Sequence, residues 1–274
     1  MQTSPKVVQQ FFEAQATYWH DVYSGADVFS NVVRRREAIA LAWIEGLGLA
    51  PRTRALEVGC GAGGLAVKLA QMGMSVQALD TVPAMVTLTR SRSVVAGVEG
   101  QLRASEGDVH SLSFRDASYQ LVTALGVLPW LHSPAKAVQE MGRVLEPGGF
   151  MVFSADNWTG LDQLIDPFRN PYLAPFKRAA QRALVTVGAK RDEPFAQPQV
   201  LRRRDVERIL GDAGLKRIDS TTCGFGPFSM FKKQVLSDRF GIALDQGLQS
   251  MVDRDVPVFR SAGHHYMVLA HKLS

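Results

Sequence analysis

The chain has 274 residues, of which 46% are hydrophobic and 21% are charged, values that are ordinary for a globular protein and exclude a disordered chain. The formal net charge of +5 comes from 31 Lys and Arg residues against 26 Asp and Glu residues. The basic residues form short runs such as Arg34–Arg36 instead of a long tail, which indicates a solvated surface and argues against a nucleic-acid partner.

Cysteine content, the first residues and the length of apolar runs indicate the cellular compartment of the protein. Cys60 and Cys223 are the only cysteines, too few for a disulfide framework or a cysteine-rich metal site, which is typical of a reducing compartment. The first residues lack the basic and apolar segments of a secretory signal. No apolar run approaches the roughly 18–20 residues that span a bilayer. The sequence predicts a cytoplasmic protein without stable membrane insertion.

Residues 1–48 are expected to form a helical arm. Ser4 and Pro5 are typical of a helix start, and the apolar residues after them fit a helical face only with an interruption near Gln15. Ser30 is the expected cap of a second helix, which Gly46 would close.

From residue 49 to residue 156, short apolar runs alternate with helical stretches. The expected strands are Ala55–Val58, Met74–Leu79, Gln101–Ala104, Tyr119–Leu125 and Phe150–Ser154. Strands that alternate with helices at this spacing form a mainly parallel sheet that is covered on both faces. This segment therefore predicts an α/β core.

The regular alternation stops at residue 157. Residues 157–202 contain several prolines and an amphipathic basic stretch, Phe176–Val187, and their length indicates an inserted cap. Residues 203–274 are expected to complete the core around a second insertion. Their expected elements are a helix at Asp205–Ala213 and strands at Arg217–Thr222 and Tyr266–His271.

A glycine-rich loop follows the first expected strand. Gly59, Gly61 and Gly63 allow a sharp turn and let the backbone approach a ligand closely. A glycine triplet is also typical of NAD and FAD domains, and it can form a strand–helix turn without any ligand. Glu57 stands two residues before the first glycine, where a pyrophosphate would meet its charge. A ligand with an amino group and a sulfonium is more compatible with this carboxylate.

Two further carboxylates follow the next strands. Asp80 ends the second expected strand, where it can accept hydrogen bonds from both hydroxyls of a ribose. Asp108 follows Gly107 and can lie beside an adenine amino group, with Val109 against the ring.

The motif series resembles that of class I S-adenosylmethionine-dependent methyltransferases, most closely the small-molecule branch called type 11. The resemblance covers roughly residues 55–154 and rests on motifs in the expected order: Leu56–Leu65, Asp80, Gly107–Val109, Leu125–Val127 and Arg143–Gly149. It implies a Rossmann-like, seven-stranded, mainly parallel sheet whose last strand is antiparallel. It also implies S-adenosylmethionine as the methyl donor and S-adenosylhomocysteine as the product.

The resemblance assigns cofactor contacts along the strand ends. The methionine part would lie against Gly59, Cys60, Gly61 and Gly63, near Glu57, with the backbone of Leu125 and Gly126 beside the sulfonium. The adenosine part would contact Asp80, Thr81, Val82, Asp108 and Val109. Tyr23 or Tyr18, from the helical arm, would close over the cofactor.

Methyl transfer is an in-line displacement that depends on alignment and exclusion of water, and a weakly acidic acceptor also needs a general base. His132 follows the fourth strand and is the first candidate, although it can equally be a loop histidine with a satisfied hydrogen bond. His20 is a second candidate. The pair His264 and His265 is more simply the start of the last strand, because no metal-binding partner for it can be placed.

Two more features concern the reaction. Trp19, Tyr23 and Trp130 are candidates for an aromatic wall beside the sulfonium, although aromatic residues at helical spacing more often pack a core. No paired-carboxylate cluster follows the fourth strand, so we expect no metal.

The inserted regions are rich in Phe, Leu, Met and Pro, which suits a small, apolar organic metabolite of biosynthetic or secondary metabolism, with O-methylation favoured over N- or C-methylation. The alternatives are methylation of tRNA, rRNA or protein, and a non-catalytic S-adenosylmethionine-binding scaffold. Against a nucleic-acid substrate, the fourth strand lacks an Asn/Asp-Pro-Pro-aromatic signature and no basic RNA-binding module is apparent. A homodimer is left open.

Overall fold

The computed structural model describes residues 4–173, 175–177, 179, 198–231 and 233–273. Its N-terminal arm consists of helices α1 (Pro5–Ala14), α2 (Ala16–Asp21) and α3 (Val28–Gly46). Gln15 separates the first two helices, so the interruption lies where the apolar pattern predicts it. The expected amphipathic stretch from residue 176 to residue 187 lies mostly outside the described residues.

The prediction that Ser30 caps α3 is wrong, because the capping residue is Asp27. The Asp27 carboxylate accepts a hydrogen bond from the backbone N–H of Ser30 at 2.9 Å and another from its hydroxyl at 2.6 Å. A carboxylate at this position satisfies a free N–H group of the first helical turn. Ser30 is therefore a donor inside the first turn, and the helix begins earlier than expected.

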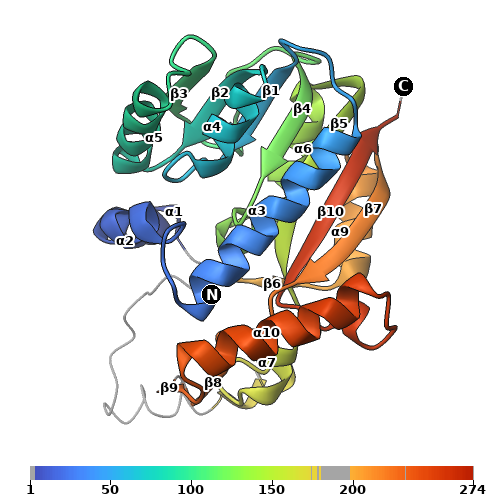
Figure 1. Cartoon of the computed structure of the whole chain (residues 1–274). Helices are drawn as coiled ribbons and strands as arrows, with labels where there is room; N and C mark the ends of the chain where they lie inside the picture. Colours follow the sequence, from blue (N-terminus) through green and yellow to red (C-terminus); the bar gives the residue numbers. More distant parts are fainter. Residues whose placement is uncertain (1–3, 174, 178, 180–197, 232, 274) are drawn as a thin grey trace.

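The core is a sheet with the strand order β3-β2-β1-β4-β5-β10-β7 (Figure 1). Its strands are β1 (Arg54–Val58), β2 (Ser75–Asp80), β3 (Leu102–Glu106), β4 (Tyr119–Ala124), β5 (Leu145–Asn157), β7 (Leu215–Cys223) and β10 (His265–Lys272). Strands β1 to β5 pair in parallel, and β10 lies antiparallel between β5 and β7. This confirms a Rossmann-like, mainly parallel sheet whose last strand is antiparallel.

A short additional strand, β6 (Val200–Leu201), was not expected from the sequence. It pairs in parallel with the last two residues of β5, Asp156 and Asn157. The pairing of β5 with β4 ends earlier, at Phe153. Because buried backbone groups need hydrogen-bond partners, β6 completes the edge of β5 where β4 has ended. Two residues are too few to produce a recognisable pattern.

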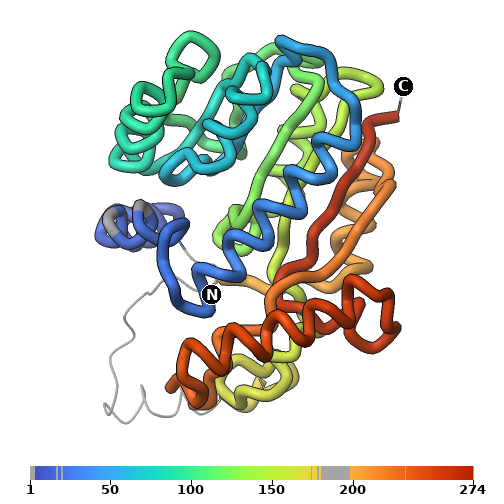
Figure 2. The backbone as a smooth tube through the Cα atoms, viewed as in Figure 1, coloured from blue at the N-terminus to red at the C-terminus, as the bar shows by residue number. Residues whose placement is uncertain are grey.

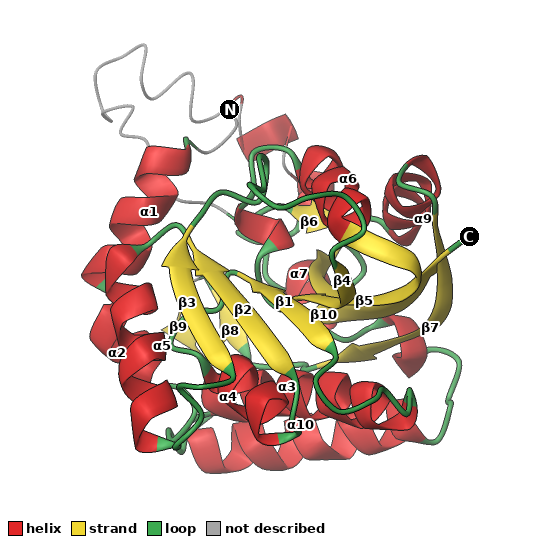
Figure 3. Ribbon diagram, turned by 90° about the horizontal axis from the view of Figure 1, so that it is seen from above, coloured by secondary structure: helices red, strands yellow, loops and turns green. Residues whose placement is uncertain are grey.

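Helices cover both faces of the sheet (Figure 3). Helix α3 lies on one face with α4 (Gly64–Gln71) and α5 (Pro83–Val95), and α6 (Pro134–Val144) lies on the other with α9 (Arg203–Asp212). Each face has its own apolar core. The first contains Ile44, Leu65 and Leu69, and the second contains Met141, Phe153, Val206 and Tyr266.

The remaining elements gather beyond the carboxyl ends of the strands (Figures 1 and 2). They are α1, α2, α7 (Leu161–Ile165), the turns η1 (Leu128–Trp130), η2 (Pro171–Leu173) and η3 (Phe259–Ser261), the hairpin of β8 (Ser229–Met230) and β9 (Lys233–Gln234), and α10 (Asp238–Asp253). Helix α10 packs on α3, where the Asn31 amide donates to Asp245 at 2.9 Å. None of the helices described here combines the length and the hydropathy required to cross a bilayer.

Candidate active site

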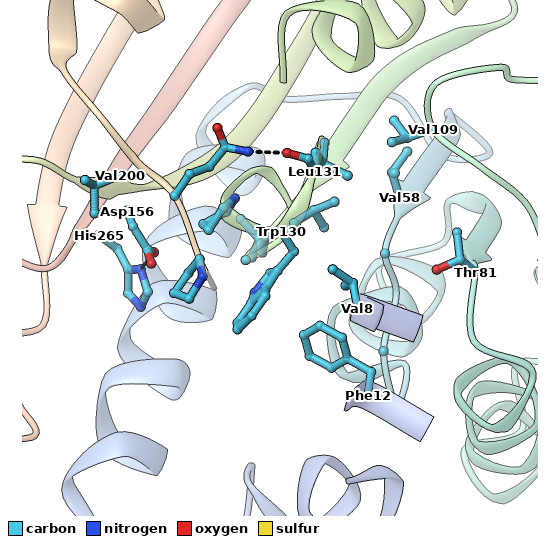
Figure 4. A pocket seen from close by; sticks show the side chains of 18 of the residues that line it. Val8, Phe12, Val58, Thr81, Val109, Trp130, Leu131, Asp156, Val200 and His265 are labelled. Carbon is cyan, nitrogen blue, oxygen red and sulfur yellow. Dashed lines mark hydrogen bonds and ion pairs between the residues drawn. The ribbon is translucent and has the colours of Figure 1, made fainter. Parts of the chain in front are cut away.

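A cavity of about 1630 Å³ opens at the carboxyl ends of the strands. This exceeds the roughly 300–1,000 Å³ of a typical ligand pocket, so there is room for a cofactor and an acceptor together. Figure 4 shows Val109 and Thr81 at one end of the cavity and Asp156 and His265 at the other. Trp130 lies between the two ends.

The glycine loop forms part of the cavity wall. Gly59 and Gly61 have φ angles of 64° and 52°, which favour glycine, and with Cys60 they line the cavity. A Cβ atom on Gly59 would lie 2.4 Å from Cγ2 of Val127. Gly63, the third expected position, lies outside the lining, and a Cβ atom there would meet Thr89 at 2.8 Å. Gly63 also has a φ of 80°, so both its left-handed backbone and the tight packing of α4 against α5 favour glycine at this position.

We expect Gly59→Ala to destabilise the chain by about 2–3 kcal/mol, from the unfavourable φ angle and the collision with Val127. The matched control is Gly97→Ala, because Gly97 has a φ of 66° and a Cβ atom added there would have no neighbour within 4 Å. The control should lose only about 1 kcal/mol, the cost of the φ angle alone. Chemical denaturation would measure both, and equal losses would contradict a close approach at Gly59.

The Asp80 carboxylate is fixed at the end of β2 by two backbone groups. One oxygen accepts a hydrogen bond from the N–H of Gly61 at 2.9 Å, and the other accepts from the N–H of Val82 at 3.0 Å. Burial raises the pKa of Asp80 above its usual value. The Gln9 amide donates to the backbone oxygen of Thr81 at 3.1 Å, so α1 reaches over this end of the cavity.

Asp108 belongs to a group that sequence analysis found only in part. Its Oδ1 accepts a hydrogen bond from the backbone N–H of His110 at 2.9 Å and lies 2.7 Å from Nδ1 of the His110 ring. Burial acts to raise the pKa of Asp108, but the hydrogen bonds from His110 outweigh it and lower that pKa. The His132 ring stacks on His110, with ring centroids 3.8 Å apart. His132 therefore lies in the cavity lining at the end that holds Asp108 and Val109.

Glu57 lies at the floor of the cavity with one carboxylate oxygen, Oε2, buried and without a hydrogen-bond partner in the described part of the chain. Burial raises its pKa well above the usual value, and the nearby charges of Glu37 and Asp80 raise it further. An oxygen without a partner at this position would suit a ligand that donates hydrogen bonds or carries positive charge.

The raised pKa of Glu57 makes a pH-dependent prediction for the cofactor-free chain. Below the unfolded pKa of Glu57, about 4.3, the side chain is protonated in both the folded and the unfolded chain, and the folded chain has its full stability. As the pH rises through the higher folded pKa, the buried carboxyl group must ionise and this stability is lost. Glu57→Gln should therefore be more stable than the parent at pH 8, by at least about 1.4 kcal/mol for a tenfold difference in proton affinity. At pH 4 the two should be equal. Denaturation at both pH values measures this, and a gap that is larger at pH 4 would contradict it.

The helical arm places its aromatic residues differently. Tyr23 lies against the glycine loop, where a Cβ atom on Gly64 would be 3.0 Å from its ring, and burial raises its pKa to about 12. Tyr18 lies outside the cavity lining and stacks against Phe29. His20 belongs to α2, and its side chain is outside the described part of the structure.

An aromatic group covers the middle of the cavity. Trp130 stacks on Phe11, with ring centroids 5.4 Å apart, and meets the edge of Phe12 at 5.1 Å. Trp19 packs against Phe12 at 5.5 Å. Trp19, Tyr23 and Trp130 all line the cavity, so the three aromatic residues of the expected wall share one space.

Arg36 is a buried cation that the sequence analysis missed. The run Arg34–Arg36 suggested a solvated surface, but Arg36 is only 9% exposed, because it lies on the side of α3 that faces the sheet. Its guanidinium group lies against the end of β4, where a Cβ atom on Gly126 would be 2.6 Å from Nη1. Arg36 Nε has no hydrogen-bond partner among the described residues. Arg36, Leu125 and Gly126 all line the cavity.

The histidine pair at the start of β10 has carboxylate partners that sequence analysis could not place. His264 Nδ1 lies 2.7 Å from Asp162, its Nε2 lies 3.6 Å from Asp156, and His265 Nδ1 lies 3.1 Å from Asp156. Burial acts to lower the pKa of His264, but the two carboxylates outweigh it and raise that pKa to about 9. Burial and the positive charge of His264 lower the pKa of His265 to about 4.

Comparisons with known proteins agree with this geometry. Residues 56–153 match the model of the type 11 methyltransferase domain. A ubiquinone biosynthesis O-methyltransferase from Paracidovorax citrulli is 32% identical over 120 residues, which cover 43% of this chain and half of that protein. A protein of the same name from Burkholderia pseudomallei is 23% identical over 215 residues, 78% of this chain and 83% of its own length. The structure of a magnesium protoporphyrin IX methyltransferase from Synechocystis PCC 6803 with bound S-adenosylhomocysteine has a TM-score of 0.64, with 16% identity over 98% of this chain and all of its own. Residues 56–153 are therefore a methyltransferase domain of type 11, and the sheet around them has the Rossmann-like fold of S-adenosylmethionine-dependent methyltransferases.

Proposed function

We propose that the chain transfers the methyl group of S-adenosylmethionine to a hydroxyl oxygen of a small, apolar organic metabolite. The observation that carries this proposal is the cavity in which the glycine loop and Asp80 share a space with Phe12, Trp19 and Trp130. Aromatic walls suit an apolar acceptor. The name of the relatives, which are ubiquinone biosynthesis O-methyltransferases, supports oxygen as the methylated atom.

The groups that lack partners in the cavity fit the charged groups of the methionine part of the cofactor, which are a carboxylate, an ammonium and a sulfonium. Arg36 Nε is a buried donor without a partner among the described residues, and it would bind the carboxylate. Glu57 Oε2 is a buried acceptor in the same condition, and it would receive the amino group or lie near the sulfonium. Asp80 would hold the ribose hydroxyls, and Asp108 would hold the adenine amino group.

S-adenosylmethionine supplies a methyl group that is already activated by its sulfonium. The chain therefore has to align the acceptor and exclude water from the reacting atoms. Phe12 and Trp130 would exclude water, because they lie over the middle of the cavity. A hydroxyl acceptor must also lose its proton, and His132 is the proposed general base because it lines the cavity and histidine is the side chain that most often moves a proton in catalysis.

His132→Gln tests this role. We expect turnover to fall about 100-fold, the lower part of the range for loss of a general base, while S-adenosylhomocysteine affinity changes less than about threefold. The measurement is the pH profile of kcat together with calorimetric binding. His271→Gln is the control, because His271 lies on β10 outside the cavity lining and packs against Phe150. Turnover that stays unchanged at every pH would remove His132 from the mechanism.

The acceptor itself would be found with methyl-labelled S-adenosylmethionine and a panel of compounds. The panel contains phenols and catechols with and without alkyl chains, carboxylic acids, amines, tRNA and protein. We expect a labelled methyl ether of an apolar hydroxylated compound and release of S-adenosylhomocysteine. Labelled tRNA or protein would overturn the proposal. Cofactor binding without turnover on any member of the panel would favour a scaffold.

A further inference from the structure

A compact group of nitrogen and oxygen ligands lies at the end of the cavity away from Asp80. It joins strands β5 and β10, where His265 pairs in register with Asp156 and His264 precedes it in the chain. Asp156, His264 and His265 each offer one ligand atom, and these atoms lie within 4.8 Å of one another. All three residues line the cavity.

The distances in this group suit a metal ion. His265 Nδ1 lies 3.1 Å from one oxygen of Asp156, and His264 Nε2 lies 3.6 Å from the other. Ligand atoms around a tetrahedral ion, at bond lengths of ~2.0–2.1 Å, are roughly 3.3 Å apart. The three ligand atoms lie within 4.8 Å of one another, so their side chains would have to close by at most about 1.5 Å to reach this spacing.

A second carboxylate orients one of the histidines. Asp162 lies 2.7 Å from Nδ1 of His264 and is itself paired with Arg169 at 2.8 Å. Histidines that bind metal almost always give their other ring nitrogen to a carboxylate or carbonyl, which fixes the ring. His264 thus has its Nε2 directed toward Asp156, the arrangement that a ligand histidine requires.

One buried ring nitrogen at this end of the cavity has no hydrogen-bond partner among the described residues. His265 is 5% exposed, and its Nε2 has no hydrogen-bond partner in the ranges that the structure describes. Two imidazoles and one carboxylate form the ligand set of sites that keep further coordination positions open. Such positions would face the cavity, because all three residues line it.

This group lies on the acceptor side of the expected methyl donor. Ser154, two residues before Asp156 on β5, accepts a hydrogen bond from the N–H of Gly126 at 2.8 Å. Two strand residues span roughly 7 Å, so Asp156 lies about that far beyond Ser154 along β5. Arg36, the proposed partner of the cofactor carboxylate, lines the same cavity as His265.

We propose that Asp156, His264 and His265 bind a divalent first-row transition metal ion, with Zn²⁺ the leading candidate, at the acceptor end of the cavity. Imidazole ligands favour such ions over Mg²⁺ and Ca²⁺. An open coordination position would let the ion bind an acceptor oxygen and lower its pKa. Metal binding by these residues does not depend on which acceptor is methylated. It differs from the prediction made from the sequence, which is that the chain binds no metal.

The test is a titration of the untagged, chelator-treated full chain with Co²⁺, followed by visible absorption, and with Zn²⁺ in competition with a chromophoric indicator. We expect one ion per chain with micromolar or tighter affinity. His265→Gln and Asp156→Asn should each weaken Co²⁺ binding at least 100-fold. Asp162→Asn, which keeps all three ligands, should weaken it by 10- to 100-fold.

His271→Gln is the matched control, because it removes a histidine of the same strand that lies outside the cavity lining, and its Co²⁺ affinity should equal that of the parent. S-adenosylhomocysteine binding by each variant verifies the fold independently of metal. The proposal is overturned if the parent chain binds no Co²⁺ or Zn²⁺ below millimolar concentration, or if His265→Gln binds as the parent does. In either case the failure leaves the proposed O-methylation standing, because the acceptor panel tests that separately.

Discussion

Asp80→Asn is expected to weaken S-adenosylhomocysteine binding about 100-fold. The reason is that a charged carboxylate would accept both ribose hydroxyls, and a hydrogen bond to a charged group is worth about 1.5–3 kcal/mol. Asparagine keeps one acceptor and replaces the other by a donor, which would face the N–H of Gly61 or of Val82. Titration calorimetry with S-adenosylhomocysteine, which avoids turnover, measures the loss directly.

Glu106→Gln is the control for this prediction. Glu106 ends the neighbouring strand β3 and pairs in register with Asp80, but it is exposed and lies outside the cavity lining. The control removes the same charge one strand away, so it should leave affinity within about twofold, since exposed charges interact weakly. A similar loss in both variants would mean that general electrostatics, and not contact with the ribose, determines binding.

The part of the site that sequence analysis could predict is the part that is local in the chain. Each of β1, β2 and β3 is followed at once by its motif: the glycine loop begins directly after β1, Asp80 ends β2, and Asp108 lies two residues after β3. Because parallel strands end at the same edge of a sheet, such residues are brought together by topology alone. A strand pattern and a motif after it were therefore sufficient for the glycine loop, Asp80 and Asp108.

The residues that sequence analysis missed depend on pairing across long separations. His265 meets Asp156 only because β10 returns antiparallel beside β5 in one register, and a shift of β10 by one residue would turn His265 to the opposite face of the sheet. Arg36 was missed for a different reason. Three consecutive arginines look alike in sequence, and only the rotation of α3 against the sheet decides that Arg36 is buried while Arg35 reaches Asp253 at the surface.

The fold also gathers polar groups of the cavity from both ends of the chain. Arg36 comes from the helical arm, Asp156 from the fifth strand and His265 from the last. The motif region 56–153 contains none of them, although all three line the cavity. The motif region therefore leaves out Arg36, the proposed partner of the cofactor carboxylate, and Asp156 and His265 of the proposed metal site.

Arg36→Met has opposite expected effects on binding and on stability. If Arg36 pairs with the cofactor carboxylate, removing one partner of a buried charge pair costs about 3–5 kcal/mol, so affinity for S-adenosylhomocysteine should fall roughly 150- to 4,000-fold. In the cofactor-free chain the Arg36 guanidinium group is buried, and its Nε has no hydrogen-bond partner among the described residues. A buried charged group of this kind lowers the stability of the folded chain. Methionine keeps most of the apolar stem, so the free energy of unfolding without cofactor should not decrease.

Arg35→Met separates this pattern from a general effect of removing positive charge. Arg35 is the residue before Arg36 on α3, and its guanidinium group donates to Asp253 at 2.6 Å with both side chains partly exposed. Its replacement should cost at most about 1 kcal/mol of stability, the value of a surface ion pair, and should leave cofactor affinity unchanged. Denaturation and calorimetry on both variants give the comparison. An Arg36→Met chain that is several kcal/mol less stable yet binds S-adenosylhomocysteine normally would mean that Arg36 supports the fold and not the cofactor.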